Sequence, residues 1–182
     1  KYIITDLNGD GEISDDDRTY VGDAQPDLTF GWQNNFTWKN WDFSFFFRGT
    51  IGNKVLNNPR AAYANNTYLI GTNALDDELT YTMKESSRVC SYYLENGSFI
   101  RLDNLALGYT FDTKKINWLD KARLYFAAQN LFVITGYKGL DPEVELFRGE
   151  SSDTDAGLSP GIEPRQFFPK ARTFTLGVNL TF

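Results

Sequence analysis

Residues 28–38 read Leu-Thr-Phe-Gly-Trp-Gln-Asn-Asn-Phe-Thr-Trp, and residues 41–47 read Trp-Asp-Phe-Ser-Phe-Phe-Phe. Large apolar side chains alternate with polar ones along most of both segments, which is the pattern of β-strands with two different faces. Lys39 and Asn40 separate the segments, so we expect a hairpin with a tight turn. Each strand has about ten residues, the length that crosses a bilayer when a strand is tilted.

The same alternation returns later in the chain. Three further segments carry it: 99–111, 122–134 and 171–182. The connections are alternately short, at 39–40 and 112–121, and long and polar, at 52–97 and 136–169. Transmembrane barrels have short periplasmic turns and long external loops. We therefore expect an all-β fold made of antiparallel strands of a transmembrane β-barrel, with long extracellular loops that also include residues 5–27.

The apolar side of these strands is expected to meet lipid. Its expected members are Phe30, Trp32, Phe36, Phe43, Phe45, Phe47, Leu105, Leu107, Tyr109, Phe174, Leu176 and Val178. Four aromatic residues would gather at the periplasmic rim, as in an interfacial girdle. They are Trp38, Trp41, Trp118 and Phe182.

The expected sheet cannot close on itself, because the smallest single-chain barrels have eight strands. Residues 1–4 are interpreted as the end of a sixth strand that pairs with 28–38. Strand 171–182 is expected to pair with 122–134 and, on its other edge, with the first strand of a barrel. An open edge in lipid leaves backbone groups unpaired at a cost of several kcal/mol each, so both edges require partners.

Composition excludes other classes of function. The 182 residues carry a net charge of −6, no His and one Cys. The chain has no basic stripe, which argues against nucleic acid, and without His no Ser-His-Asp or Cys-His site is possible. We expect no enzyme, because the carboxylates of the long connections single out no pair. Cys90 is expected to be an unpaired thiol, and no apolar run reaches the roughly 18 residues of a transmembrane helix.

Residues 6–17 follow the spacing of an EF-hand calcium loop. The expected Ca²⁺ ligands are Asp6, Asn8, Asp10, Glu12, Ser14 and Asp17. Glu12 would act through its carbonyl, Gly11 would allow the sharp turn, and Asp17 stands where Glu is usual. The alternative is a solvated turn rich in Asp and Asn. No paired helices are expected around it, so the site would be a structural clip within an extracellular loop.

Four parts of the chain resemble the SusC/RagA family of TonB-linked outer-membrane proteins. They are 6–13 followed by 26–31, 94–111, 128–143 and 169–182. The resemblance implies that 1–182 is the C-terminal part of a TonB-dependent receptor barrel of 22 strands, without its plug domain. It also implies import of glycans or peptides across the outer membrane of Bacteroidetes, powered by TonB with a SusD-like surface lipoprotein. Phe182 would then be the end recognised by the barrel-assembly machinery.

A secreted, calcium-stabilised β-sandwich that acts as an adhesin or carbohydrate-binding module is the alternative. It would bury the aromatic strand faces between two sheets instead of exposing them. Tyrosines of the long connections would either stack on a sugar or pack a loop: Tyr63, Tyr68, Tyr92, Tyr93 and Tyr137. The sequence indicates neither the transported substrate, nor the residues that contact it, nor the oligomeric state.

Overall fold

The computed structural model describes residues 3–66, 71, 73–82, 90–114, 116, 118–144, 160–165 and 168–182. Its elements group into two compact units. The sheet unit comprises Pro26–Gly52, Gly97–Gly136 and Phe168–Phe182, and the loop unit comprises Lys1–Gln25, Asn53–Asn96 and Tyr137–Phe167. Within the described ranges no helix is both long enough and apolar enough to cross a membrane.

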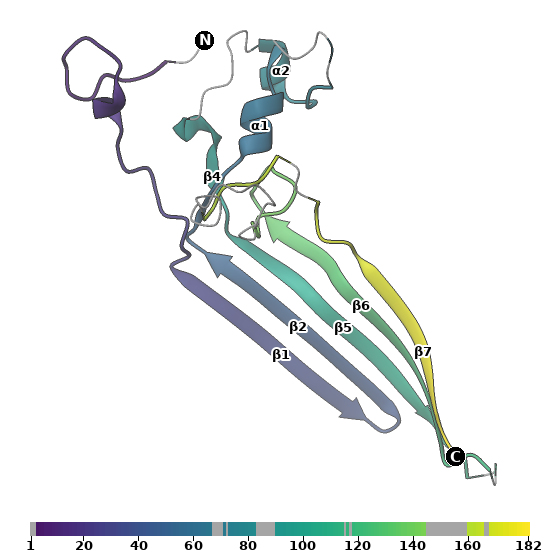
Figure 1. Ribbon diagram of the computed structural model, residues 1–182. Coiled ribbons are helices and arrows are strands. Elements are labelled where there is room, and N and C mark those ends of the chain that lie inside the picture. Colours follow the sequence, from purple (N-terminus) through teal and green to yellow (C-terminus); the bar gives the residue numbers. More distant parts are fainter. Residues whose placement is uncertain are drawn as a thin grey trace, which may run out of the picture. The chain divides into compact units, whose positions relative to one another are not determined.

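The sheet unit is one layer of five antiparallel strands (Figure 1). The strands are β1 (Leu28–Trp38), β2 (Trp41–Ile51), β5 (Phe99–Phe111), β6 (Lys121–Thr135) and β7 (Thr173–Thr181). They lie in the order β1-β2-β5-β6-β7, so every strand pairs with its sequence neighbour in the sheet. The five strands expected from the sequence are confirmed, and so is the alternation of short and long connections. Lys39 takes a positive φ of 54° in the turn between β1 and β2, as tight hairpin turns require.

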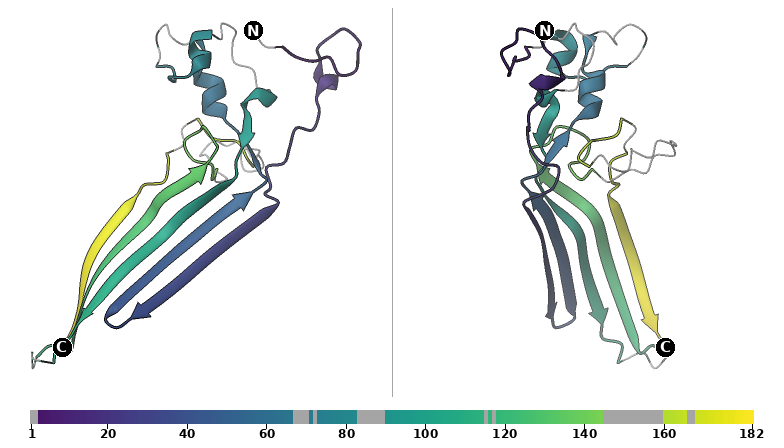
Figure 2. Two further views of the ribbon diagram at one scale, coloured as in Figure 1. Left: turned by 180° about the vertical axis from the view of Figure 1, so that it is seen from behind. Right: turned by 60° about the vertical axis from the view of Figure 1, so that its left-hand side comes forward.

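The middle of the sheet departs from simple alternation. The register between β2 and β5 shifts between Phe46 and Phe47, and that between β5 and β6 shifts between Leu102 and Asn104. Asn130 of β6, close to this point, has a φ of 51°. A β-bulge of this kind bends a strand and increases its twist. The strands curve in both views of Figure 2.

The sixth strand expected at residues 1–4 is not present at its described positions. Ile3 and Ile4 belong to no strand, and the ladder partner of β1 among the described strands is β2 alone. Ile3 is 97% exposed. Ile3 and Ile4 belong to the loop unit and not to the sheet unit, and they lead directly into a loop that turns at Gly9 and Gly11 with positive φ. Residues 1–2 lie outside the described residues.

The loop unit has secondary structure that the sequence did not predict. Its elements are η1 (Asp15–Asp17), β3 (Lys54–Leu56), α1 (Asn58–Tyr63), α2 (Glu78–Thr82), η3 (Ser91–Tyr93) and β4 (Leu94–Asn96). β3 pairs with β4 antiparallel. Ala61, Ala64 and Tyr93 form a small buried cluster against which Leu56 and Cys90 pack. The described residues of the segment 52–97 therefore include a small core of their own.

Candidate functional site

One face of the sheet is apolar across all five strands. Phe43, Leu107, Phe126 and Leu176 lie directly opposite one another in successive ladders, and Phe36 extends this row onto β1. All twelve residues expected to share a lipid-facing side lie on this face, because cross-strand partners point the same way. Leu176 is 73% exposed. Large exposed apolar patches mark protein or membrane contacts, and this one extends over a whole sheet.

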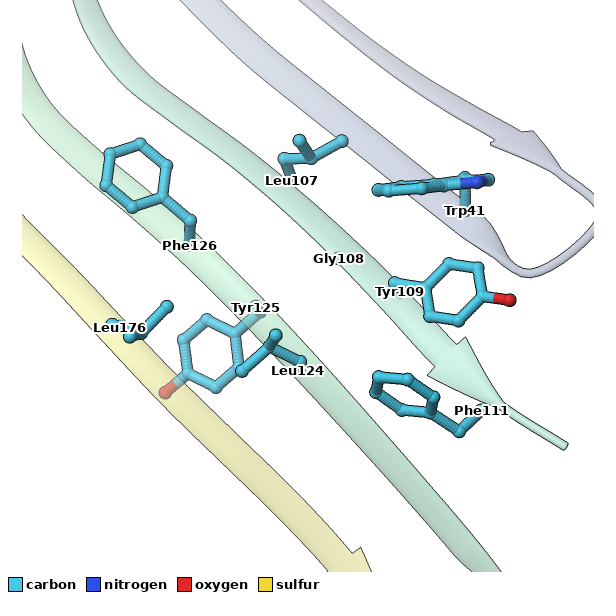
Figure 3. Close-up of a pocket in the computed structure, with 9 residues that line it drawn as sticks. All are labelled: Trp41, Leu107, Gly108, Tyr109, Phe111, Leu124, Tyr125, Phe126 and Leu176. Carbon is cyan, nitrogen blue, oxygen red and sulfur yellow. The ribbon is translucent and has the colours of Figure 1, made fainter. Parts of the chain in front are cut away.

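A shallow groove of about 280 Å³ lies in the apolar face between β2, β5, β6 and β7 (Figure 3). It is lined by Trp41, Leu107, Gly108, Tyr109, Phe111, Leu124, Tyr125, Phe126 and Leu176. The rings drawn in Figure 3 come from three different strands. Such a groove suits an apolar chain better than a polar ligand, because few hydrogen-bonding atoms are available in it.

Aromatic side chains gather at the end of the sheet that holds the two short connections. Trp38 lies directly opposite Trp41, whose ring centroid is 4.7 Å from that of Tyr109. Trp118 stacks on Phe182 with centroids 5.8 Å apart. The clustering of Trp38, Trp41, Trp118 and Phe182 at one rim is thus confirmed. Trp118 and Phe182 remain 68% and 73% exposed, which is typical of residues that anchor a protein at a membrane interface.

The opposite face is mostly polar, with Phe46 as its large apolar residue on β2, and it carries paired charges. Asp42 of β2 accepts a hydrogen bond from Arg123 Nε of β6 at 2.9 Å, across the intervening β5. The pair passes over Gly108, where an added Cβ would collide with both side chains. Arg48 Nε lies 3.1 Å from Asp103 Oδ2 on the same side. A sheet with one apolar and one polar face is the pattern of a barrel wall between lipid and an aqueous lumen.

Neither edge of the sheet has a partner strand among the described residues. Among the strands that the structure describes, β7 pairs only with β6 and β1 pairs only with β2. The expected pairing of 171–182 with 122–134 is confirmed, and its other edge has no partner within the described residues. The described strands therefore form no closed barrel. The sandwich alternative required a buried aromatic face, whereas Trp32 is 58% and Phe174 60% exposed.

The acidic loop is held by hydrogen bonds from its own backbone. Asp6 accepts from the N–H of Gly9 at 2.6 Å and from that of Gly11 at 2.8 Å. Asp17 accepts from the N–H groups of Ser14 and Leu7, each at 2.8 Å. These donors hold the pKa of Asp17 below its usual value, Ser14 contributing most and Leu7 next. Gly11 has a φ of 84°, as the sharp turn expected from the sequence requires.

Three of the remaining expected calcium ligands accept hydrogen bonds from the backbone of the loop. Asn8 Oδ1 accepts from Asp10 N at 3.0 Å, Asp10 Oδ1 accepts from Glu12 N at 2.8 Å, and Ser14 Oγ accepts from Asp16 N at 3.2 Å. The described residues include no group of three or more His, Cys, Asp or Glu arranged to hold a metal. Each carboxylate oxygen has a further lone pair. The donor set therefore has the chemistry for calcium, although its carboxylates do not converge on one point.

The loop unit contains charged contacts that the sequence did not reveal. Arg60 Nε donates to Asp77 at 2.8 Å and its Nη1 donates to Glu95 at 3.3 Å. The pKa of Arg60 is raised, first by the hydrogen bond with Asp77. The Tyr137 hydroxyl donates to the fully buried Glu163 at 2.6 Å, and burial raises the pKa of Tyr137. No sequence pattern marks these pairs, because their partners come from separate segments.

The tyrosines that were candidates for sugar stacking differ in exposure, and Tyr63, in α1, is half-buried. Tyr93 is fully buried and Tyr137 is 6% exposed, so both pack the loop unit. Tyr92 is 55% exposed and its ring lies 5.5 Å from the Arg60 guanidinium carbon. Tyr68 lies outside the described residues.

Comparison with known proteins gives a consistent result. The chain is 36% identical to TonB-dependent receptor P3 of Formosa agariphila, covering 99% of this chain and 19% of that protein. It is 30% identical to TonB-dependent receptor SusC of Bacteroides thetaiotaomicron, covering 99% of this chain and 17% of that protein. The chain thus spans about a fifth of the length of these relatives. No family model matches it.

Solved structures show the same fold. The chain superposes on the RagAB peptide importer in the closed-closed state with a TM-score of 0.72 and 25% identity, covering 97% of this chain and 20% of that one. A structure of the RagAB peptide transporter gives a TM-score of 0.72 and covers 94% of this chain and 19% of the other. These matches confirm the antiparallel strands expected for a segment of a transmembrane barrel of this class.

Proposed function

This chain belongs to the SusC/RagA family of TonB-dependent receptors, and from that premise we propose that its sheet is part of the wall of a barrel that imports a nutrient. The family resides in the outer membrane of Gram-negative bacteria, and so does this chain. The proposed cargo is a glycan or a peptide. The apolar face would contact lipid and the polar face would line the lumen.

The observation that carries this proposal is the division of a single-layer sheet into two chemically different faces. The row from Phe43 to Leu176 offers lipid no hydrogen-bonding group, while Asp42 and Arg123 on the other face require a polar medium. A soluble protein would need to cover the apolar face. In a bilayer the same face needs no cover, since lipid chains are as apolar as leucine.

The partners proposed for the whole receptor follow from its family. They are a SusD-like surface lipoprotein, TonB acting through another part of the receptor, and the remaining strands and plug domain. The free edges of β1 and β7 support this, because both must pair with further strands if the sheet lies in lipid. We propose no nucleic-acid partner and no enzymatic activity for this chain.

Cysteine labelling tests the assignment of the two faces in the full-length receptor. Leu107 and Ala106 are neighbours on β5 with opposite directions, so Leu107→Cys and Ala106→Cys form a matched pair in a Cys90→Ser background. In outer membranes a water-soluble maleimide should label the Ala106→Cys receptor much faster, while both should react equally after denaturation. Faster labelling of Leu107→Cys in membranes would exclude the proposed orientation. The cargo class would be identified by comparing the uptake of labelled glycans and of labelled peptides between wild-type and receptor-deleted cells.

We further propose that residues 6–17 bind calcium as a structural clip. The supporting observations are the spacing of Asp6, Asp10 and Asp17 and the left-handed turn at Gly11. Asp6 and Asp17 are half-buried and the rest of the loop is exposed, so an ion there would order the loop without desolvating a fully buried charge. The extracellular side supplies calcium at concentrations where weak sites of 10⁻⁴–10⁻³ M suffice.

Calorimetric titration of the full-length receptor tests the calcium proposal. Calcium should bind the wild-type receptor, and Asp10→Asn should weaken that binding by at least tenfold. Asp15→Asn is the matched control, since Asp15 lies in the same loop but outside the expected ligand positions. Equal binding by the wild type and Asp10→Asn would refute the site without affecting the barrel proposal.

A further inference from the structure

Asn130 joins three separate segments of the sheet unit. It lies in β6, where its φ of 51° places it in the left-handed region. Asn tolerates that conformation better than most residues. The position adjoins the register shift between β5 and β6 at Leu102 and Asn104. The backbone at Asn130 is therefore part of the β-bulge that bends the strand.

The side chain of Asn130 uses both ends of its amide. Its oxygen accepts a hydrogen bond from Arg101 Nη1 of β5, and Arg101 is only 1% exposed. Its nitrogen donates to the carbonyl of Lys170 at 2.7 Å and to that of Ala171 at 3.3 Å. An uncharged amide is the side-chain group that can accept from a guanidinium and donate to carbonyls at once.

These contacts lie where the ladder between β6 and β7 begins. The first paired residues are Gln129 and Thr173, immediately beside Asn130. Before Thr173 the incoming chain has no ladder partner on β6, and the Asn130 amide binds it instead. The alternation of side chains along β7 excludes a slip of one residue against β6 but permits a slip of two, so a further contact is needed to fix the register of this ladder.

We propose that Asn130 is a positioning residue that fixes the register at which β7 joins the sheet. Arg101 holds the Asn130 amide oxygen, which leaves the amide nitrogen directed at the carbonyls of Lys170 and Ala171. The point at which the second long connection returns to the sheet is thereby set. This inference rests on the geometry of the sheet unit and does not depend on transport.

The expected effect of losing the amide is a slip of β7 by two residues. A slip of one residue would turn Phe174, Leu176 and Val178 to the polar face, which the apolar pattern opposes. A slip of two residues keeps every side chain of β7 on its own face of the sheet and loses little apolar contact. Without a specific anchor the two registers would therefore compete.

Disulfide trapping in the full-length receptor reads the register directly, in a Cys90→Ser background. Ala127 lies opposite Thr175, so cysteines at these positions report the native register. Cysteine pairs at 127 and 173, and at 129 and 175, report slips of two residues in either direction. Direct partners have Cα atoms about 4.5–5.5 Å apart, within reach of a disulfide, whereas diagonal partners about 7–8 Å apart are outside it.

Two variants separate the backbone of Asn130 from its amide. Asn130→Gly keeps the left-handed conformation without the side chain, and Asn130→Asp keeps an acceptor for Arg101 but cannot donate to the two carbonyls. In each variant the yield of the native cross-link should fall several-fold, and the yield of one of the two slipped cross-links should rise. Gln129→Ala, at the neighbouring position, should keep the cross-link between 127 and 175 and should give none between 127 and 173.

A native cross-link pattern in both variants overturns the proposal, because the backbone alone would then set the register. A native pattern in Asn130→Asp alone also overturns it, since the two donated hydrogen bonds would then be dispensable. If neither variant yields folded receptor on unheated gels while Gln129→Ala does, the positioning role is supported. In that case Gly has preserved the backbone and only the amide has been lost.

Discussion

Leu176→Arg provides the sharpest test of the apolar face. Leu176 is six positions from Phe182, which lies in the aromatic end of the sheet. A strand rises about 3.3 Å per residue and tilts about 40° in a barrel, so Leu176 lies roughly 15 Å above that end along the membrane normal. This is half of the hydrocarbon thickness of about 30 Å. Arginine at the midplane of a barrel costs about 2–4 kcal/mol.

Two matched substitutions on β7 make the prediction specific. Thr175→Arg places the same charge on the polar face at nearly the same depth, and it should cost less than about 1 kcal/mol. Leu180→Arg lies on the apolar face but only two positions from Phe182, where the cost falls to about 0–1 kcal/mol. Leu176→Arg should therefore lower the free energy of unfolding much more than either Leu180→Arg or Thr175→Arg.

The assay is a denaturant titration of the full-length receptor folded into lipid vesicles, followed by the fluorescence of its tryptophans. Free energies of unfolding are compared among the three variants and the wild type. Equal costs for Leu176→Arg and Thr175→Arg would refute the assignment of faces. Equal costs for Leu176→Arg and Leu180→Arg would refute the placement of the aromatic end at the interface.

Three other predictions follow from particular contacts. The pair of Asp42 and Arg123, with side chains 38% and 25% exposed, should show a coupling of about 0.5–1 kcal/mol in a double-mutant cycle. Gly177→Ala should destabilise the receptor by about 1–3 kcal/mol, because its Cβ would collide with the Tyr125 ring, and Tyr125→Ala should relieve part of that loss in the same unfolding assay. Because the pKa of Asp17 is depressed in the folded loop, its stabilisation is present above the ordinary value of 3.8 and is lost as the pH falls through the lower folded value. The protection factors of the amides in residues 6–17 should therefore be constant from neutral pH down to the folded pKa of Asp17 and should fall below it, and Asp17→Asn should remove this step.

The strands were predictable because a two-faced sheet imposes a period of two on its sequence. β1 and β5 have the expected bounds, and the turn at Lys39 follows from the interruption between two aromatic runs. The bulge also left a signal. Leu102 and Leu105 are three positions apart, so the apolar series changes parity at Asp103, where both ladders shift.

The polar contacts were not predictable, because they depend on register and not on local pattern. Asp42 and Arg123 are 81 residues apart in sequence and meet only after three strands have aligned. The core of the loop unit escaped detection for another reason. Ala61 and Ala64 are too small to produce an apolar period, and they pack around Tyr93 in a segment dominated by polar residues.

The ladder that joins β7 to β6 resists a force differently according to the direction of that force. Its 9 residues bond to β6 through hydrogen bonds that lie across the strands. Traction along β7 loads all of these bonds together, whereas a sideways force at Phe182 breaks them one after another. Rupture that starts at Phe182 reaches the hydrogen bonds of Asn130 last, because they hold the opposite end of the strand. The ladder between β6 and β7 is therefore weak against peeling from the C-terminal end of β7 and strong against sliding of one strand along the other.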